Sequence, residues 1–180
     1  MNIKTILVPV DFSVCSFLLA EEVASLGKSL GASVTFLHVM EVPAGLHADT
    51  KIHVEGKDEG VSLVDYLTNE AKTYKQRYLS HTELMGVEAF FALKHGSIVD
   101  AILESADELE ADLIVMGTHG RQGFSRLMLG SVAESVLRQA TVPVMTLRSL
   151  HKPTCDAMSC ATCTSGFTEA EKQASAELSG

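Results

Sequence analysis

The sequence of 180 residues has no tryptophan, only four prolines, and no apolar run long enough to cross a membrane. A membrane-spanning helix needs about 20 predominantly apolar residues. Basic residues are also scarce, because 14 Lys and Arg stand against 23 Asp and Glu, for a net charge of -9. Such a surface repels nucleic-acid phosphates and anionic lipids. We therefore expect neither a nucleic acid nor a membrane as partner.

The first residues do not resemble a secretory leader. Met1 to Lys4 lead directly into an apolar, strand-like run, without the separate basic and apolar regions that such a leader has. We therefore expect a cytoplasmic protein.

Cysteine is scarce and unevenly distributed. Cys15 stands alone, and the other three lie within nine residues near the end: Cys155, Cys160 and Cys163. This distribution excludes a disulfide framework for the whole chain. Together with the loss of apolar periodicity after residue 148, it divides the chain into a domain at 1–148 and a Cys-rich tail at 149–180, which we expect to be flexible.

Strand and helix patterns alternate through the first 148 residues. Nearly continuous apolar runs predict strands at 3–8, 33–40, 87–93, 112–116 and 142–147. Apolar residues at helical spacing predict helices at 14–30, 61–79, 97–108 and 131–139. Residues 41–60 show no apolar periodicity of a helix or a strand, so we expect a long loop there. The alternation predicts an α/β fold with a single doubly wound, five-stranded parallel sheet in the flavodoxin-like order 3-2-1-4-5.

Polar residues at the predicted helix ends support these boundaries. Ser13 is a candidate N-cap and Gly31 a candidate C-terminal stop. Two segments have the spacing of capping boxes at helix starts, namely Ser97 to Asp100 and Ser131 to Glu134.

Candidate ligand-binding residues follow the first and fourth predicted strands. In an open α/β sheet, ligands bind beyond the carboxyl ends of the strands, where the strand order reverses. Gly130 and Ser131 begin a helix, whose N-terminal N–H groups suit a phosphate. Asp11 only accepts hydrogen bonds when ionised, so it suits a ribose hydroxyl or a base amine. Arg121 and Arg126 are the nearest cations for a polyphosphate.

The glycine spacing carries a family resemblance. Gly117, two residues, Gly120, nine residues and then Gly130-Ser131 resemble the ATP-binding branch of the universal stress protein family, as do the runs Val8 to Ser13, His38-Val39 and Asp112 to Gly117. The resemblance spans about residues 1–148. It implies adenine near Asp11 and the backbone of Val39. It implies ribose and phosphates along Met116, Gly117, Gly120, Gly130, Ser131 and Val132. Pro9, Val10, Arg121 and Arg126 complete the candidate set for ATP, with or without Mg²⁺.

The resemblance implies a regulatory, ATP-binding stress-response protein. We expect it to act on an unknown protein partner through conformation, with slow or no hydrolysis and no catalytic residue. Bound nucleotide would order the loops at 118–129 and 41–60. A slow Mg²⁺-dependent ATP hydrolase remains the alternative. The apolar run at 142–147, at an expected sheet edge, predicts a homodimer, since unprotected edges pair.

The tail leaves another function open. The spacing of Cys155, Cys160 and Cys163 coincides with the first three ligands of a plant-type [2Fe–2S] loop, but no fourth cysteine follows. His151 would complete a Cys₃His zinc set. A thiol sensor, or a metal sensor with Zn or Fe–S, is therefore an alternative, and exposed free thiols are the simpler interpretation.

Overall fold

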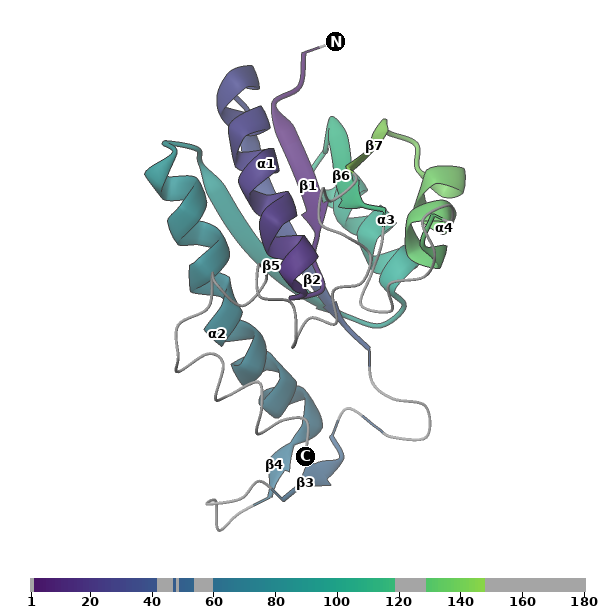
Figure 1. Cartoon of the computed structure of the whole chain (residues 1–180). Coiled ribbons are helices and arrows are strands. Elements are labelled where there is room, and N and C mark those ends of the chain that lie inside the picture. The colour runs from purple at the N-terminus through teal and green to yellow at the C-terminus, as the bar shows by residue number, and fades with distance from the viewer. Residues whose placement is uncertain (1, 42–46, 48, 54–59, 119–128, 148–180) are drawn as a thin grey trace.

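A computed structural model describes residues 2–41, 47, 49–53, 60–118 and 129–147 (Figure 1). In chain order the elements are β1 (Thr5–Pro9), α1 (Val14–Leu30), β2 (Ser33–Met40), β3 (Lys51–Ile52), β4 (Val61–Ser62), α2 (Leu63–Leu84), β5 (Ala89–His95), α3 (Ile98–Glu108), β6 (Leu113–Gly117), α4 (Ser131–Gln139) and β7 (Val144–Leu147). All nine expected elements of the domain are present. The sequence analysis missed the short antiparallel pair of β3 and β4, and it ended α2 too early.

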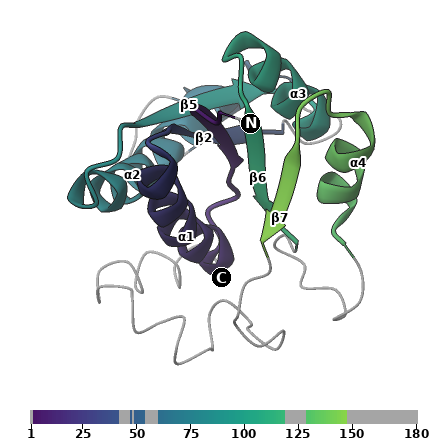
Figure 2. The same cartoon turned by 90° about the horizontal axis from the view of Figure 1, so that it is seen from above.

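The main sheet has five parallel strands in the order β5-β2-β1-β6-β7. Numbered within this sheet, the order is 3-2-1-4-5, so the predicted topology is confirmed. Helices α1 and α2 cover one face, and α3 and α4 cover the other (Figure 2). Among the helices that the structure describes, none is both long and apolar enough to cross a membrane.

Two apolar cores explain why the run around Leu7 in β1 is continuously apolar. Ile6 and Val8 of β1 point into the core under α1 and α2, while Leu7 between them points into the core under α3 and α4. All three side chains are fully buried. Because alternate residues of a strand face opposite sides, a sheet covered on both faces requires this continuous run.

The helix ends follow the sequence only in part. Ser13 is the N-cap of α1, where its Oγ accepts from the Ser16 N–H, and Gly31 ends the helix in the left-handed conformation (φ 64°). Ser97 holds the N-cap position of α3 without a side-chain capping bond. The N-cap of α4 is Gly130, so Ser131 is its first helical residue. The two capping-box predictions were therefore wrong, although both helices begin where expected.

Asp112 ties β6 to β1 at the amino ends of the strands. Its Oδ2 accepts from the backbone N–H groups of Lys4 (2.7 Å) and Thr5 (3.0 Å), and its own N–H donates to the Thr5 carbonyl. The two donors lower the pKa of Asp112, because they favour its ionised form. This tie fixes the two strands in a register that brings their carboxyl ends to the same edge of the sheet.

Gly27 allows α1 to approach the sheet closely. A Cβ at this position would lie 3.0 Å from Val34 Cγ2 and 3.3 Å from Val87 Cγ1. We therefore expect Gly27→Ala to destabilise the protein by about 1–3 kcal/mol, because overpacking outweighs the better helix propensity of alanine. Urea unfolding measures this. Ser29→Ala, on the exposed side of the same helix, is the control with almost no expected change, and a stabilised Gly27→Ala variant would refute the close-approach argument.

Candidate functional site

The carboxyl ends of β1 and β6 lie side by side, because the strands pair in parallel with Leu7 opposite Ile114. The chain reaches β2 on one side of β1 and β6 on the other, so the strand order reverses here. A backbone hydrogen bond from the Gly130 N–H to the Thr118 carbonyl (2.9 Å) fixes the start of α4 beside the end of β6. The predicted switch-point edge therefore brings together the segments that hold Asp11, Gly117 and Gly130.

No side chain of the described residues caps the N-terminus of α4. Its first intrahelical bond runs from the Glu134 N–H to the Gly130 carbonyl (2.9 Å), and Gly130 itself has no side chain to offer. The N–H groups of Ser131, Val132 and Ala133 precede this bond, and N–H groups in that position have no intrahelical acceptor. The helix dipole adds partial positive charge at the same point. This end of α4 suits a phosphate or another anion.

A network of serine hydroxyls holds the Asp11 side chain. Asp11 Oδ1 accepts from Ser16 Oγ (2.5 Å), from Ser13 Oγ (2.6 Å) and from the Ser13 N–H (3.0 Å). The Asp11 N–H in turn donates to Ser16 Oγ (3.1 Å). The carboxylate at the end of β1 is therefore fixed before any ligand arrives.

Stacked rings support the turn that follows Asp11. Phe12 has a left-handed backbone conformation (φ 63°), which costs a non-glycine residue about 1–3 kcal/mol. Its ring stacks on His38 at 3.8 Å and on Tyr74 at 4.6 Å between centroids. His38 Nδ1 lies 2.8 Å from the Val10 carbonyl and therefore donates to it. The ring stack and this bond join the ends of β1 and β2.

The Tyr78 hydroxyl lies buried behind this turn. Burial first, and the negative charge of Asp11 second, raise the pKa of Tyr78 far above its ordinary value, so the phenol stays protonated. The Ser16 hydroxyl and the Phe12 backbone lie near enough to oppose this shift in part. Nevertheless, none of the residues that the structure describes lies in hydrogen-bonding geometry with the Tyr78 hydroxyl, and Tyr78 is 1% exposed.

The predicted residues that the structure describes divide into three groups. Asp11, Pro9, Gly117, Gly130, Ser131 and Val132 lie along the edge described above. Val10 and Met116 also lie there, but their side chains are buried in opposite cores, so a ligand meets only their backbone. Val39, near the end of β2, is half-buried against the core under α3 and α4.

Other predicted residues lie outside the described part of the chain. Gly120, Arg121 and Arg126 are among them, and so are the tail residues His151, Cys155, Cys160 and Cys163. Cys15 is a free, half-buried thiol in the first turn of α1. Within the described ranges, no three His, Cys, Asp or Glu side chains are grouped to hold a metal ion.

The sequence analysis missed Ser16, Phe12 and His38 as parts of the site. For Ser16, the signal was present: in Asp11-Phe12-Ser13-Val14-Cys15-Ser16, both serines follow the carboxylate within five residues. The left-handed Phe12 had no signal, because a bulky residue rarely adopts that conformation. The His38 contact depends on strand pairing, which local spacing does not reveal.

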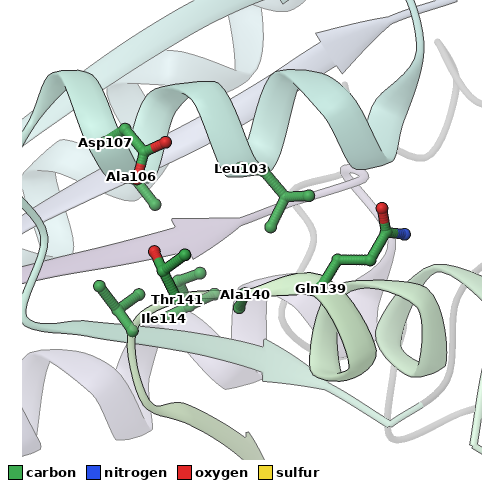
Figure 3. Close-up of a pocket in the computed structure, with 8 residues that line it drawn as sticks. Leu103, Ala106, Asp107, Ile114, Gln139, Ala140 and Thr141 are labelled. Carbon is green, nitrogen blue, oxygen red and sulfur yellow. The ribbon is translucent and has the colours of Figure 1, made fainter.

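A small cleft of about 180 Å³ lies elsewhere, between the ends of α3 and α4 and the starts of β6 and β7 (Figure 3). Its lining residues are Leu103, Ala106, Asp107, Ile114, Gln139, Ala140, Thr141 and Val142. None of the predicted ligand-binding residues lines it. The volume is below the roughly 300–1,000 Å³ of typical small-molecule sites, so we do not assign it a ligand.

A doubly wound parallel sheet with a helix N-terminus at its switch point defines a class of α/β domains that bind ligands at this edge. The model of the universal stress protein family matches residues 2–148, and the chain belongs to that family. Universal stress protein MJ0531 of Methanocaldococcus jannaschii is 33% identical over 151 residues, which are 83% of this chain and 84% of that protein.

Solved structures share the fold. Protein MJ0577, also of Methanocaldococcus jannaschii, superposes with a TM-score of 0.68 at 23% identity and covers 84% of this chain and all of its own. A universal stress protein solved in complex with cAMP has a TM-score of 0.59 at 20% identity, covering 82% of this chain and 98% of that one. These likenesses confirm the fold that the sequence predicted.

Proposed function

We propose that this protein binds ATP at the carboxyl edge of β1 and β6 and acts in the cytoplasm as a nucleotide-dependent regulator in a stress response. One observation carries the proposal. The uncapped N-terminus of α4 is fixed beside the end of β6, on the same edge as the carboxylate of Asp11 at the end of β1. The first feature suits phosphate, and the second suits a hydroxyl or amine donor.

The family supports the choice of an adenine nucleotide, since a relative with the same fold was solved with cAMP. The acidity of the chain is no obstacle. Helix N-terminal N–H groups bind phosphate without net positive charge, whereas nucleic-acid binding requires many cations.

Calorimetric titration of the purified full chain with ATP tests the proposal. We expect one site per chain, binding in the micromolar range, and weaker binding of GTP. The absence of any binding heat at millimolar ATP would contradict the proposal. The same preparation with Mg²⁺ decides between regulator and hydrolase, because turnover of about 1 s⁻¹ or faster is typical of an enzyme. We expect turnover well below that rate.

We further propose that the chain forms a homodimer through β7. This strand lies at an edge of the sheet, and among the described strands it pairs only with β6. Its Met145 side chain is 38% exposed. An edge strand with an exposed apolar side chain favours pairing with a second copy.

Met145→Asp is expected to convert the dimer to a monomer, because it places a charge in an apolar strand contact. Sedimentation velocity at micromolar concentration measures the change. Phe90→Asp provides the matched control, since Phe90 is 52% exposed on β5 at the opposite edge of the same sheet. A monomeric wild-type protein would refute the dimer.

A further inference from the structure

Ser16 directs its only donor and one of its two acceptor sites at a single residue, Asp11. A serine hydroxyl has one proton to donate, and an ionised carboxylate can only accept. The short contact between Ser16 Oγ and Asp11 Oδ1 (2.5 Å) therefore fixes the hydroxyl proton on Asp11. The Asp11 N–H then donates back to the same oxygen (3.1 Å). Ser16 is 8% exposed, in the first turn of α1, and packs under the site without reaching solvent freely.

Ser13 closes the network from the other side. Its Oγ accepts from the Ser16 N–H (3.2 Å), so its own proton is directed at Asp11 Oδ1 (2.6 Å). With the Ser13 N–H (3.0 Å), three donors converge on one carboxylate oxygen. An oxygen of this kind has about two lone-pair sites, so Oδ1 has no capacity left. A ligand donor must bind at Oδ2.

We propose that Ser16 is a positioning residue that, with Ser13, locks the Asp11 carboxylate so that Oδ2 is presented to a hydrogen-bond donor of the nucleotide. The proposal rests on the proposed function and deepens it. The donor is a ribose hydroxyl or the exocyclic amine of adenine. Preorganising the acceptor removes the cost of ordering it on binding, so the lock acts on ligand discrimination.

The experiment compares the wild-type chain with Ser16→Ala, using ATP, 2′-deoxy-ATP, 3′-deoxy-ATP and ITP as probes in calorimetric titrations. ITP lacks the exocyclic amine, and each deoxynucleotide lacks one hydroxyl. The wild type is expected to bind at least one analogue about tenfold more weakly than ATP, as loss of a bond to a charged acceptor implies. In Ser16→Ala, that preference is expected to fall about fivefold, because only the two Ser13 donors then remain on Oδ1 and the carboxylate is held less firmly.

Two further variants separate positioning from stability. Ser25→Ala makes the same change on an exposed position of the same helix and should keep the wild-type preference. Ser16→Thr retains the hydroxyl and should therefore retain part of the wild-type preference for ATP over the analogue.

Each outcome has a defined meaning. Equal weakening of ATP and all analogues in Ser16→Ala would show a structural role and overturn the inference. A wild type that binds ATP without discriminating among the analogues would overturn it as well, while the proposed function would stand. A wild type that binds none of the four would refute the proposed function itself.

Discussion

Gly130→Val is expected to weaken ATP binding about 100-fold or more while the fold is retained. Gly130 has an ordinary extended backbone (φ -61°, ψ 148°), so valine can adopt its conformation without strain. The branched side chain would stand at the N-terminus of α4, where phosphate would approach the N–H groups of Ser131 and Val132. Loss of two hydrogen bonds to a charged group, each about 1.5–3 kcal/mol, corresponds to at least this factor.

Ser97→Val is the matched control for Gly130→Val. Ser97 is the N-cap of α3, it has a similar backbone conformation (φ -63°, ψ 126°), and its side chain makes no capping bond either. Both variants therefore introduce the same side chain at an uncapped helix start, with a comparable cost of about 1 kcal/mol or less in stability. ATP affinity is expected to be lost only in the first. If Gly130→Val and Ser97→Val bound ATP with equal affinity, the phosphates would not bind at the N-terminus of α4.

Tyr78→Ala is expected to destabilise the protein by about 3–5 kcal/mol, the range for removing a buried aromatic ring. Tyr78 is 1% exposed, and its ring centroid lies 4.5 Å from that of Phe17 and 5.1 Å from that of Phe36. It joins α2 to α1 and the sheet in the core under these helices. Urea unfolding followed by circular dichroism measures the change.

Tyr78→Phe is expected to leave the stability of the protein unchanged or to raise it. It retains the ring and removes a buried hydroxyl that lies in hydrogen-bonding geometry with none of the residues that the structure describes. Leaving such a group unpaired costs about 1–3 kcal/mol, so the variant should be at least as stable as the wild type. If instead it lost more than about 1 kcal/mol, the hydroxyl would have a partner in solution, and the nearby Ser16 would be the first candidate.

The sequence predicted the architecture well because the dominant signals are local or nearly so. The nearly continuous apolar runs around Leu7 and Val34 indicate a sheet covered on both faces, and the right-handed crossover rule leaves few strand orders. The pair of β3 and β4 escaped prediction, since two-residue strands such as Lys51–Ile52 have no period to detect.

The site was predictable in position but not in detail. Asp11, Gly117 and Gly130 were found because ligands bind at the switch point of such sheets. The sequence could not show that Val10 and Met116 bury their side chains in opposite cores, because that depends on the pleat at the strand ends. Nor could it show that three donors converge on one oxygen of Asp11, which depends on the left-handed backbone of Phe12.

The central claim is that an adenine nucleotide binds where β1, β6 and the start of α4 meet. Titration of the ¹⁵N-labelled 180-residue chain with ATP, followed by amide chemical shifts, tests it most directly. The account predicts that the largest shifts fall on Asp11, Gly117, Gly130, Ser131 and Val132, with Val39 also affected. Saturating shifts confined to the cleft around Leu103 and Gln139, or no shifts at millimolar ATP, would contradict it.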